Sequence, residues 1–500
     1  MSEAPRTQRI RDPVHGLIVF REDKPLDQLA WRLLDAPEFQ RLRRIRQLGV
    51  SEFVFPSATH TRFAHSVGVF HTARSLIEII KREISGIGQI FNPKRAEVAV
   101  VAALLHDLGH GPFSHAFENA QKSRGVAKRH EKWTEEIIRA PEGEIRPLLE
   151  GHWPEGGFCD SVAAMIEADD PEDIYHAVVS SSFDADRLDY LRRDRLMTGT
   201  GAGAIDFDWL MEQIRVREIV IDAADANDET DQERVATFCL DMKALPAAEQ
   251  FLLARYTLHE QVYFHKTTRC VEHMIAKLLS KVAEQAKHPA TASTQTGLDR
   301  NHPLLRFFGE GGATIANYLA VDDSVVTGSL EGMVYAADSG IADLADRLRE
   351  RCLYKTLDLR AAFGHDEGRQ RRAARRIDKD FEAQLRSGSV IKDEEAAVSI
   401  YTQIGGDDER AHKKLHILDA KGPREITEIS PIVRVLGQKT QFARYYFENE
   451  SDRQSASRAI SKFESYAGHS GAPRSGEPGI HNHWQRAMDS GLATFGGAPE

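Results

Sequence analysis

The stretch LLHDLGHGPFSH, residues 104–115, closes an apolar run that begins near residue 96, and the run ends on a histidine and an aspartate. Because the run is apolar on nearly every side of a helix, that helix and its end should be buried. Burying His106 and Asp107 costs free energy unless a metal, a hydrogen-bond network or a nearby cation compensates them. The Gly, His and Pro residues that follow break the helix and leave His110 at a concave point. The stretch therefore predicts a polar site at the end of a buried helix.

The bulk composition limits the class of protein. A chain of 500 residues is long enough for two or three lobes, and its 41% hydrophobic and 28% charged residues are typical of soluble globular proteins. The net charge of −11 means that the field of the whole molecule does not attract phosphate-rich partners. An anionic ligand must then be held by a local basic cluster, and a dedicated nucleic-acid binder is not indicated.

Cysteine usage and the N-terminal sequence indicate the compartment. The four cysteines lie far apart without a CxxC pair, which disfavours both a disulfide framework and a zinc ribbon and fits a reducing environment. The start of the chain lacks the apolar segment of a signal peptide, and no apolar run approaches the roughly 18 residues of a membrane span. We expect a cytoplasmic protein without a membrane partner.

The hydrophobic periodicity predicts a mainly α-helical fold. A short hairpin is expected over residues 8–22, centred on His15 and Gly16. Periodic helical segments then follow, and the last of them is one long or kinked helix of about 40 residues. These segments are residues 26–35, 38–49, 66–84, 96–109 and 246–285.

The C-terminal part changes in character. A polar loop over 284–302 and further helices to about residue 385 precede four predicted strands and one last helix. The strands are expected at 396–404, 413–420, 431–437 and 441–448, and the helix at 451–463. The predicted organisation is a hairpin segment over 1–25, a helical core over 26–385, a small α+β lobe over 386–465 and a disordered tail, rich in Gly, Pro and Ser, over 466–500.

Histidines are concentrated in one third of the helical region, with three carboxylates among them. Imidazole nitrogen and carboxylate oxygen together suit a borderline divalent metal. A lone His-Asp pair is more typical of a structural helix end, and the stretch SSFDADRLDYLRRD, residues 181–194, taken alone is more typical of an amphipathic helix with paired surface charges. The clustered residues are His60, His65, His71, His106, His110, His115, His130, Asp107, Glu118 and Glu131.

The order His, His-Asp, Asp on successive helices resembles the HD-domain metal-dependent phosphohydrolases. Longer stretches occur in the order found in deoxynucleoside triphosphate triphosphohydrolases: QLGVSEFVFPSATHTRFAHSVGV, LLHDLGHGPFSH, RHEKWTEEI, FDADRLDYLRRD and YFHK. The sequence is most similar to the branch of the vertebrate sterile-alpha-motif HD protein and the bacterial dGTPase-like enzymes, over residues 8–360. The resemblance implies a helical HD core, and we expect no sterile-alpha-motif domain.

The resemblance also implies a metal site and a reaction. The ligands would be His65, His106, Asp107 and Asp186. Asp186 is chosen among four nearby aspartates because the family ligand directly precedes a basic residue, here Arg187 where lysine is usual. The metal would be Fe, Mn, Zn, Mg, Co or Ni. A metal-bound water would attack the α-phosphate and release deoxynucleoside and inorganic triphosphate.

Further residues receive roles from the same likeness. Arg62, Arg187, Tyr190 and Arg255 would hold the triphosphate, while Gln47, Leu48, Asp194, Tyr263 and His265 would recognise the nucleoside. Gln47 and Asp194 would bind the sugar 3′-hydroxyl, and Tyr263 would exclude a 2′-hydroxyl. His110, His115, Glu118 and His130 would line the water and leaving-group side. His115 is the candidate general acid, oriented by Glu118 or paired with His130, or else it only orders water.

A second set of residues matches the segment that binds an activating guanine nucleotide at a subunit interface in this family. The set comprises Asp35, Gln40, Arg43, Arg351 and Lys355. It would imply a homodimer or homotetramer. Gln8 and Arg9 depart from the usual pattern, in which a lysine comes first, and ordinary surface charge is the alternative interpretation.

Two other functions compete with this one. An HD phosphodiesterase or nuclease would act on cyclic nucleotides or single strands, but the sequence shows no GYP signature beside the His-Asp pair. A nucleotide-sensing protein, such as one serving phage defence, could use a decayed HD scaffold. All four predicted metal ligands are present, which argues against decay.

Overall fold

The computed structural model describes residues 7–126, 128–201, 205–220, 234–393, 397–398, 411–436, 440–441 and 443–465. Its first element is the predicted hairpin, in which β1 (Thr7–Asp12) pairs antiparallel with β2 (Gly16–Arg21). Asp12 is opposite Gly16, and Gly16 has a φ of +73°, a conformation that glycine adopts without strain. The hairpin prediction is therefore confirmed.

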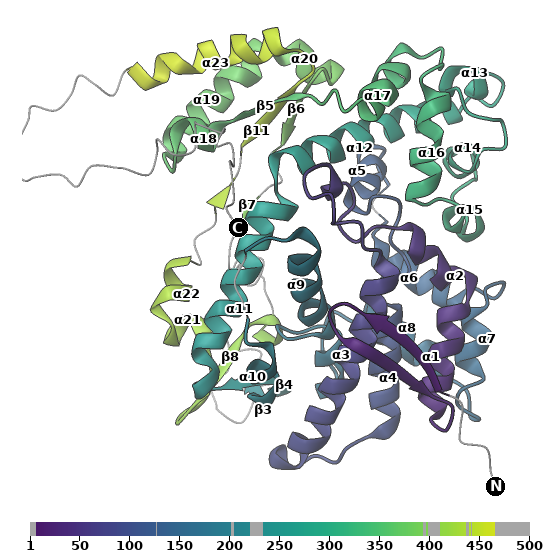
Figure 1. Ribbon diagram of the computed structural model, residues 1–500, viewed down its shortest axis with the longest axis vertical. Coiled ribbons are helices and arrows are strands. Elements are labelled where there is room, and N and C mark those ends of the chain that lie inside the picture. Colours follow the sequence, from purple (N-terminus) through teal and green to yellow (C-terminus); the bar gives the residue numbers. More distant parts are fainter. Residues whose placement is uncertain are drawn as a thin grey trace, which may run out of the picture.

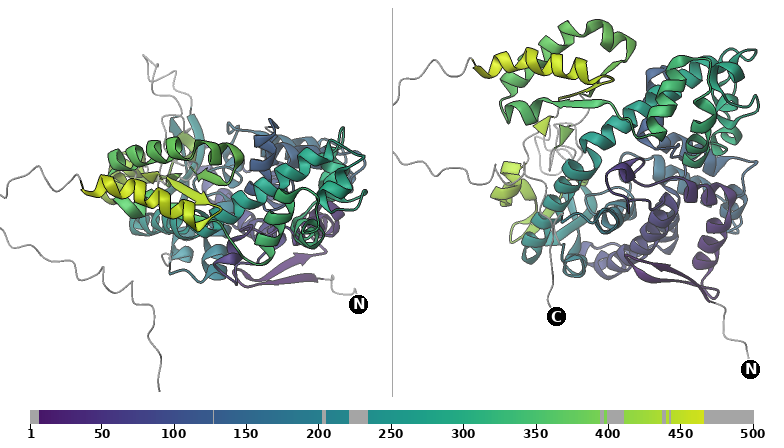
Figure 2. Two further views of the ribbon diagram at one scale, coloured as in Figure 1. Left: turned by 90° about the horizontal axis from the view of Figure 1, so that it is seen from above. Right: turned by 45° about the horizontal axis from the view of Figure 1, so that its top comes forward.

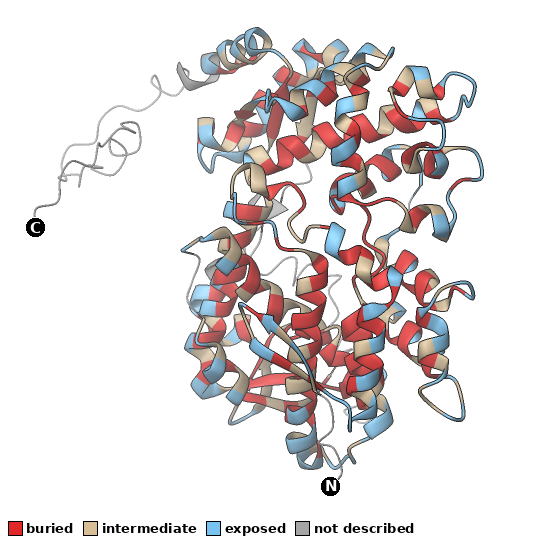
Figure 3. Ribbon diagram, turned by 45° about the vertical axis from the view of Figure 1, so that its right-hand side comes forward, coloured by how far each residue is buried: buried red, intermediate tan, exposed pale blue. Residues whose placement is uncertain are grey.

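A layer of packed helices lies in the half of the molecule that carries the β1–β2 hairpin (Figure 1), and buried residues run through the interior of that half in Figure 3. Helix α4 (Pro93–Leu105) packs against α3 (Arg62–Glu83) and α8 (Phe158–Glu167), and α3 packs in turn against α9 (Ala185–Thr198). Every residue of α4 from Val98 to Leu105 is buried, as its uniformly apolar sequence predicts. The mainly α-helical core is confirmed, and His106 follows directly after α4.

Shorter helices make up much of the remaining helical region. In the N-terminal half they are α1 (Pro25–Asp35), α2 (Pro37–Gln40), α5 (His115–Ser123), α6 (His130–Arg139), α7 (Ile145–Glu150) and α10 (Phe207–Glu212). In the C-terminal half they are α13 (Ala292–Thr296), α14 (Pro303–Phe308), α15 (Ile315–Leu319), α16 (Asp323–Met333) and α17 (Ser339–Arg349). Helix α13 lies inside the segment predicted as a polar loop. Within the described residues, no helix has both the length and the apolar composition needed to cross a membrane.

The helix predicted over residues 38–49 is wrong beyond its first turns. Helix α2 ends at Gln40 and one 3₁₀ turn, Arg41–Arg44, follows it. The next residues instead bridge to the segment before α3, where the Arg62 amide donates to the Ile45 carbonyl and the Gln47 amide to the His60 carbonyl. These long-range hydrogen bonds override the local helical period.

The long helix predicted over residues 246–285 is confirmed in its kinked form. Helix α11 (Leu245–Leu258) continues into a π-helical turn, His259–Tyr263, before α12 (Lys266–Ala286) begins. Such turns often occur at functional sites because they re-aim the side chains they carry. Here the turn carries Tyr263.

The sequence did not reveal one sheet of the core. Strands β3 (Ile214–Val220) and β4 (Arg234–Asp241) pair antiparallel, and β4 pairs parallel with β8 (His416–Asp419), which pairs with β9 (Gly422–Glu425). Because β4 is buried on both faces, its sequence lacks the alternation that identifies a half-exposed strand.

The strand predicted at 431–437 is wrong: α21 (Ile426–Ile429) and α22 (Pro431–Leu436) occupy this region, and Pro431 suits a first helical turn.

A separate lobe has its own apolar cluster. Its antiparallel sheet has the order β5 (Lys355–Asp358), β11 (Arg444–Phe447), β6 (Val390–Asp393). Its helices are α18 (Leu359–Phe363), α19 (Glu367–Asp380), α20 (Glu382–Ser387) and α23 (Glu450–Ser465). In Figures 1 and 2 the lobe lies at the opposite end of the molecule from the β1–β2 hairpin.

The predicted α+β character of the C-terminal part is confirmed, including the strands within 413–420 and 441–448 and the last helix. Of the strand predicted at 396–404, the structure describes β7 (Ala397–Val398), paired with β10 (Thr440–Gln441). The tail over 466–500 lies outside the described residues. Strands β8 and β9 join the core sheet rather than the lobe, because β8 pairs with β4.

Candidate active site

Three helix ends place the four predicted metal ligands together. His65 is in the first turn of α3, His106 and Asp107 follow α4, and Asp186 is in the first turn of α9. His65 Nε2 lies 2.9 Å from Asp186 Oδ1 and 3.8 Å from Asp107 Oδ2. His106 Nε2 lies 3.3 Å from Asp107 Oδ1 and 3.7 Å from Asp186 Oδ1. Two imidazole nitrogens therefore face two carboxylates across one small volume.

The contacts of Nδ1 in His65 and His106 show that the four predicted ligands fit a divalent cation. His65 Nδ1 lies 2.7 Å from Asp189 Oδ2, and His106 Nδ1 lies 2.8 Å from the Ala103 carbonyl oxygen. Both contacts place an N–H on Nδ1, so Nε2 is the nitrogen that faces the carboxylates and can bind a metal in exchange for a proton. Among the residues that the structure describes, the buried His106 Nε2 has no hydrogen-bond partner. A metal bound by both Nε2 atoms, Asp107 and Asp186 would satisfy it.

The charged groups around the predicted ligands also favour a bound cation. Burial disfavours a charged His65, but hydrogen bonds with Asp186 and Asp189 outweigh it and raise the pKa of His65 to about 10. Burial likewise opposes a charged Asp107, yet Arg62 and His106 hold the pKa of Asp107 well below its usual range. Two ionised carboxylates thus stabilise positive charge between them, and a divalent cation can take the place of the proton.

The loop after Asp107 is held in an unusual conformation. Phe113 and Ser114 have positive φ values of 52° and 46°, which cost free energy in residues other than glycine. Arg62 Nη2 donates to Ser114 Oγ at 2.8 Å, and Arg62 Nη1 lies 2.6 Å from Asp107 Oδ2. The Phe113 amide donates to Asp323 Oδ1 at 2.7 Å. Asp323 and Arg62 thus fix the loop against the predicted metal ligands.

The close packing of the same loop against α6 can be tested at Gly109, where a Cβ atom would overlap the His130 carbonyl and the Thr134 amide. We expect Gly109→Ala to lower the free energy of unfolding by about 3 kcal/mol, the upper range for overpacking. Thermal and urea denaturation measure the change. Gly86→Ala is the control because nothing lies within 4 Å of a Cβ at Gly86. Equal stability of the two variants would contradict the close approach of this loop to α6.

A second polar group lies beside the predicted metal ligands. His110 Nε2 lies 3.2 Å from Asp107 Oδ1, and the rings of His110 and His130 stack with 3.9 Å between their centroids. Glu118 lies between two histidines, with Oε1 2.7 Å from His130 Nδ1 and Oε2 3.6 Å from His115 Nδ1. The four residues predicted for the water and leaving-group side are therefore neighbours.

Their protonation differs with their surroundings. Burial and the charge of Arg62 hold the pKa of His110 well below its ordinary value, so His110 is neutral. The side chain of His115 is 66% exposed, and Glu118 raises the pKa of His115. Burial opposes a charged Glu118, but its hydrogen bonds with His115 and His130 lower the pKa of Glu118 strongly. His115 is therefore the histidine of this group suited to carry a transferable proton.

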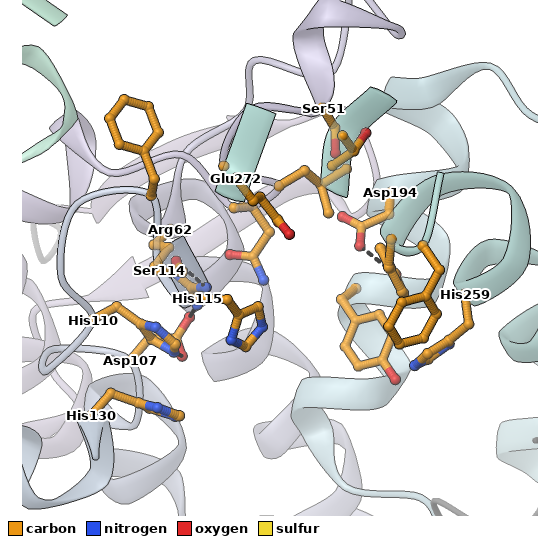
Figure 4. A pocket seen from close by; sticks show the side chains of 18 of the residues that line it. Ser51, Arg62, Asp107, His110, Ser114, His115, His130, Asp194, His259 and Glu272 are labelled. Carbon is orange, nitrogen blue, oxygen red and sulfur yellow. Dashed lines mark hydrogen bonds and ion pairs between the residues drawn. The ribbon is translucent and has the colours of Figure 1, made fainter. Parts of the chain in front are cut away.

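Both groups open into one cavity of about 380 Å³. Figure 4 shows His115 between the Asp107, His110 and His130 side and the Asp194 and His259 side. Gln47, Leu48, Tyr190, Asp194 and Tyr263 also line the cavity, as predicted residues for the nucleoside and triphosphate.

Asp194 and Tyr263 form a fixed pair at the far wall. The Tyr263 hydroxyl donates to Asp194 Oδ2 at 2.7 Å, and Asp194 Oδ1 lies 2.8 Å from His60 Nε2. Burial and the charge of Asp194 raise the pKa of Tyr263 well above its ordinary value, so the phenol stays a donor. His60, which the sequence reasoning gave no role, thus orients this carboxylate.

Three of the predicted substrate-binding residues lie outside the cavity lining as the structure describes it. Arg187 contacts Asp184 and the Ser181 carbonyl instead. His265 accepts the Thr267 amide at the start of α12 and packs against Phe55. Arg255 is buried in α11, where its carbonyl oxygen lies 2.8 Å from His259 Nδ1.

The cavity also contains residues that the sequence analysis missed. Arg269 and Glu272, one turn apart on α12, line it and form an ion pair at 3.0 Å. Ser114 and Phe113 line it as well. Arg269 and Glu272 lie three residues apart on a predicted helix, and this spacing was the available signal for them. Nothing in the local sequence distinguishes Ser114.

The residues predicted to bind an activator lie away from this cavity in the described part of the chain. Asp35, Arg43, Arg351 and Lys355 are exposed. Gln40 Oε1 accepts a hydrogen bond from Arg43 Nε at 2.8 Å, and Arg351 donates to the Phe53 carbonyl at 3.1 Å. Exposure leaves their side chains accessible to a ligand or a second subunit.

Comparison with known proteins places the ligands in a recognised domain. The HD domain family matches residues 62–229, which include all four predicted ligands, and the HD associated region matches residues 231–299. The protein YwfO of Bacillus subtilis is 32% identical over 350 residues, which are 70% of this chain and 71% of YwfO.

Two further similarities extend this result. The protein of Dictyostelium discoideum named deoxynucleoside triphosphate triphosphohydrolase SAMHD1 homolog is 32% identical over 297 residues, 56% of this chain, and the match spans about half (51%) of that relative's length. A crystal structure of a hypothetical protein from Aquifex aeolicus superposes with a TM-score of 0.65 at 27% identity, over 92% of this chain and 100% of that one.

Proposed function

The chain belongs to the HD-domain family of phosphohydrolases, and from that premise we propose that it hydrolyses deoxynucleoside triphosphates to deoxynucleoside and inorganic triphosphate. The observation that carries the proposal is a single cavity with the metal-binding set at one wall and the Asp194–Tyr263 pair at another. The name of the Dictyostelium relative supports the same reaction class.

The residues at the metal wall would hold and activate the phosphate chain. A divalent cation bound by His65, His106, Asp107 and Asp186 would polarise the α-phosphate and make water more acidic. Arg62, already fixed by Asp107 and Ser114, would bind a phosphate oxygen through its guanidinium group. Arg269 also lines the cavity, where Glu272 and Asp393 pair with its guanidinium group.

His115 would complete the reaction at the leaving group. When the bond between the α-phosphorus and O5′ breaks, O5′ gains negative charge and needs a proton. His115 Nδ1 faces Glu118, which leaves Nε2 to donate that proton to O5′. Glu118 keeps the imidazolium populated because it raises the pKa of His115.

The far wall would select the sugar. Asp194 and Gln47 would accept and donate hydrogen bonds at the 3′-hydroxyl, and the Tyr263 ring would occupy the space that a 2′-hydroxyl needs. The buried Gln47 Oε1 has no hydrogen-bond partner among the described residues, which suits an atom that binds substrate.

The test of the function is direct. Protein loaded in turn with Fe, Mn, Zn, Mg, Co or Ni is incubated with each dNTP and each rNTP, singly and in pairs, and inorganic triphosphate is measured. We expect triphosphate and deoxynucleoside in equal amounts from at least one dNTP. Absence of triphosphate under every pairing would overturn the proposal, and turnover of a cyclic nucleotide or a single strand in parallel samples would support the phosphodiesterase alternative.

Sugar selection gives a separate prediction at Tyr263. Tyr263→Ala removes the ring from the cavity wall, so we expect the ratio of kcat/KM for dNTP over rNTP to fall by at least about 10-fold, on the scale of removing a specific contact. Tyr263→Phe keeps the ring and loses only the hydroxyl that donates to Asp194, so it should retain the sugar preference while KM rises. An unchanged ratio in the alanine variant would exclude Tyr263 as the sugar gate.

The paired-nucleotide samples also address activation. We propose that Asp35, Gln40, Arg43, Arg351 and Lys355 bind a guanine nucleotide between subunits of a dimer or tetramer. Two carboxylate oxygens and an amide suit a guanine edge, and the cations suit its phosphates. Faster dNTP turnover with GTP present, together with a nucleotide-dependent increase in mass, would support this assignment.

A further inference from the structure

The turn of the β1–β2 hairpin is bound to α9 by buried polar contacts. His15 Nε2 lies 2.6 Å from Asp189 Oδ1, and their side chains are 3% and 0% exposed. Asp12 Oδ2 lies 2.8 Å from Arg193 Nη1, and Arg192 Nη2 donates to the Val14 carbonyl at 3.2 Å. The hairpin is therefore attached to the helix that carries Asp186.

Asp189 links this turn to the metal site. Its Oδ1 accepts from His15 and from Arg193 Nη2 at 2.9 Å, while its Oδ2 accepts from His65 Nδ1 at 2.7 Å and from Arg193 Nε at 2.8 Å. Both oxygens of a fully buried carboxylate thus have two donors each. An added Cβ at Gly68 would overlap Asp189 Oδ1 and Arg193 Nη2, so α3 and α9 approach closely around this carboxylate.

The orientation of Asp189 decides which nitrogen of His65 is free. As long as Asp189 Oδ2 accepts from Nδ1, Nε2 is the nitrogen of His65 that faces Asp186 and Asp107 and is available to a metal. If the carboxylate rotated, His65 could place its proton on Nε2 or turn its ring away from the other ligands.

We propose that the β1–β2 hairpin is a positioning element of the metal site: through His15 and Asp12 it holds Asp189 and Arg193, and Asp189 fixes the ring of the metal ligand His65. Displacing the hairpin would then weaken metal binding at a distance, without removing a ligand. The proposal rests on the metal site of the proposed function and is independent of its substrate.

The strands of the hairpin contribute differently. Ile18 and Phe20 are buried in the main core, and the Phe20 ring stacks on Phe70. A merely structural hairpin would need these apolar contacts and no specific group at residue 15. The polar turn can therefore be tested while the strands remain intact.

The test measures metal binding directly. Metal-free wild type, His15→Ala, His15→Gln and Arg11→Ala are titrated with Mn²⁺ by calorimetry, and the visible spectrum of Co²⁺-loaded protein reports ligand geometry. Arg11 is the control because it lies exposed on the same hairpin. We expect His15→Ala to weaken the metal affinity by about 10- to 100-fold, the usual effect of removing an outer hydrogen-bond partner, and to alter the Co²⁺ spectrum.

The other variants should behave differently. His15→Gln retains an N–H donor and should recover most of the affinity, and Arg11→Ala should bind metal as wild type does. Metal-free His15→Ala should melt within a few degrees of wild type. An affinity of His15→Ala within twofold of wild type would overturn the proposal, as would a wild type that binds neither metal.

A second variant covers the case in which His15→Ala does not fold. Asp12→Asn keeps the oxygen that accepts the Val14 and His15 amides but loses the charge that pairs with Arg193. Its affinity should fall, and an affinity equal to wild type would count against the proposal. Protein that binds metal but releases no triphosphate from any nucleotide would overturn the proposed function alone, because these titrations contain no substrate.

Discussion

Replacement of Asp107 by alanine is expected to abolish triphosphate release, with a loss of at least about 10³-fold, the scale of losing several kcal/mol of transition-state stabilisation. Asp107 supplies a carboxylate to the metal set and also anchors Arg62 Nη1 at 2.6 Å and His110 Nε2 at 3.2 Å. Its loss would therefore disturb the metal, the phosphate-binding guanidinium and the neighbouring imidazole together.

Because alanine would leave Arg62 buried without its carboxylate, stability has to be measured beside activity. Asp107→Asn keeps the shape of the side chain and removes the charge, so a folded Asn variant should lose both bound metal, by elemental analysis, and turnover. An Asn variant that retained metal and rate would exclude Asp107 as a ligand.

Asp184→Ala provides the matched control, since Asp184 is as deeply buried as Asp107 and lies two residues from Asp186. Asp184 caps α9, where its Oδ1 accepts the Arg187 amide at 2.8 Å. Its replacement should lower stability, because it removes both the N-cap and the carboxylate that pairs with Arg187, and should leave metal content unchanged. A folded Asp184→Ala protein that lost metal as completely as Asp186→Ala would put the choice between these aspartates in doubt.

The second large effect is expected at His115. If His115 protonates the leaving oxygen, His115→Ala should lower kcat by about 10²- to 10⁴-fold, the contribution of a positioned general acid, while bound metal stays unchanged. Asn119→Ala is the control, since Asn119 lies on the same helix and outside the residues described as lining the cavity. Single-turnover rates would separate this loss from slow product release.

The pH profile distinguishes an acid from a residue that only orders water. A general acid must be protonated, so activity is full below the pKa of His115 and is lost as pH rises through it. Glu118 raises the pKa of His115, and therefore Glu118→Gln should move this alkaline limb to lower pH. A limb that stayed in place in Glu118→Gln, with kcat reduced, would assign His115 the water-ordering role.

Local sequence predicted the elements whose pattern depends on near neighbours. The uniformly apolar α4, the His15–Gly16 turn and the kinked helix that carries Tyr263 were all recognisable, because helix and turn preferences act over a few residues. The segment after Gln40 and strand β4 were not, since partners far along the chain decide their conformation. At the site, local pattern alone did not decide whether His106, Asp107 and Asp186 were metal ligands or structural residues, and the resemblance to a family selected them as ligands.

The aspartates of α9 separate what the sequence determined from what depends on the tertiary structure. The sequence by itself indicated a helix within residues 181–194, and on such a helix Asp186 and Asp189, three residues apart, lie on one face. It could not determine which carboxylate meets the metal set, because that depends on how α3 approaches α9. The close contact at Gly68 places Asp186 beside His65 Nε2 and Asp189 behind Nδ1 of the same ring. The close packing of these two helices, which no local pattern encodes, makes Asp186 a metal-ligand candidate and leaves Asp189 to hold the ring of His65.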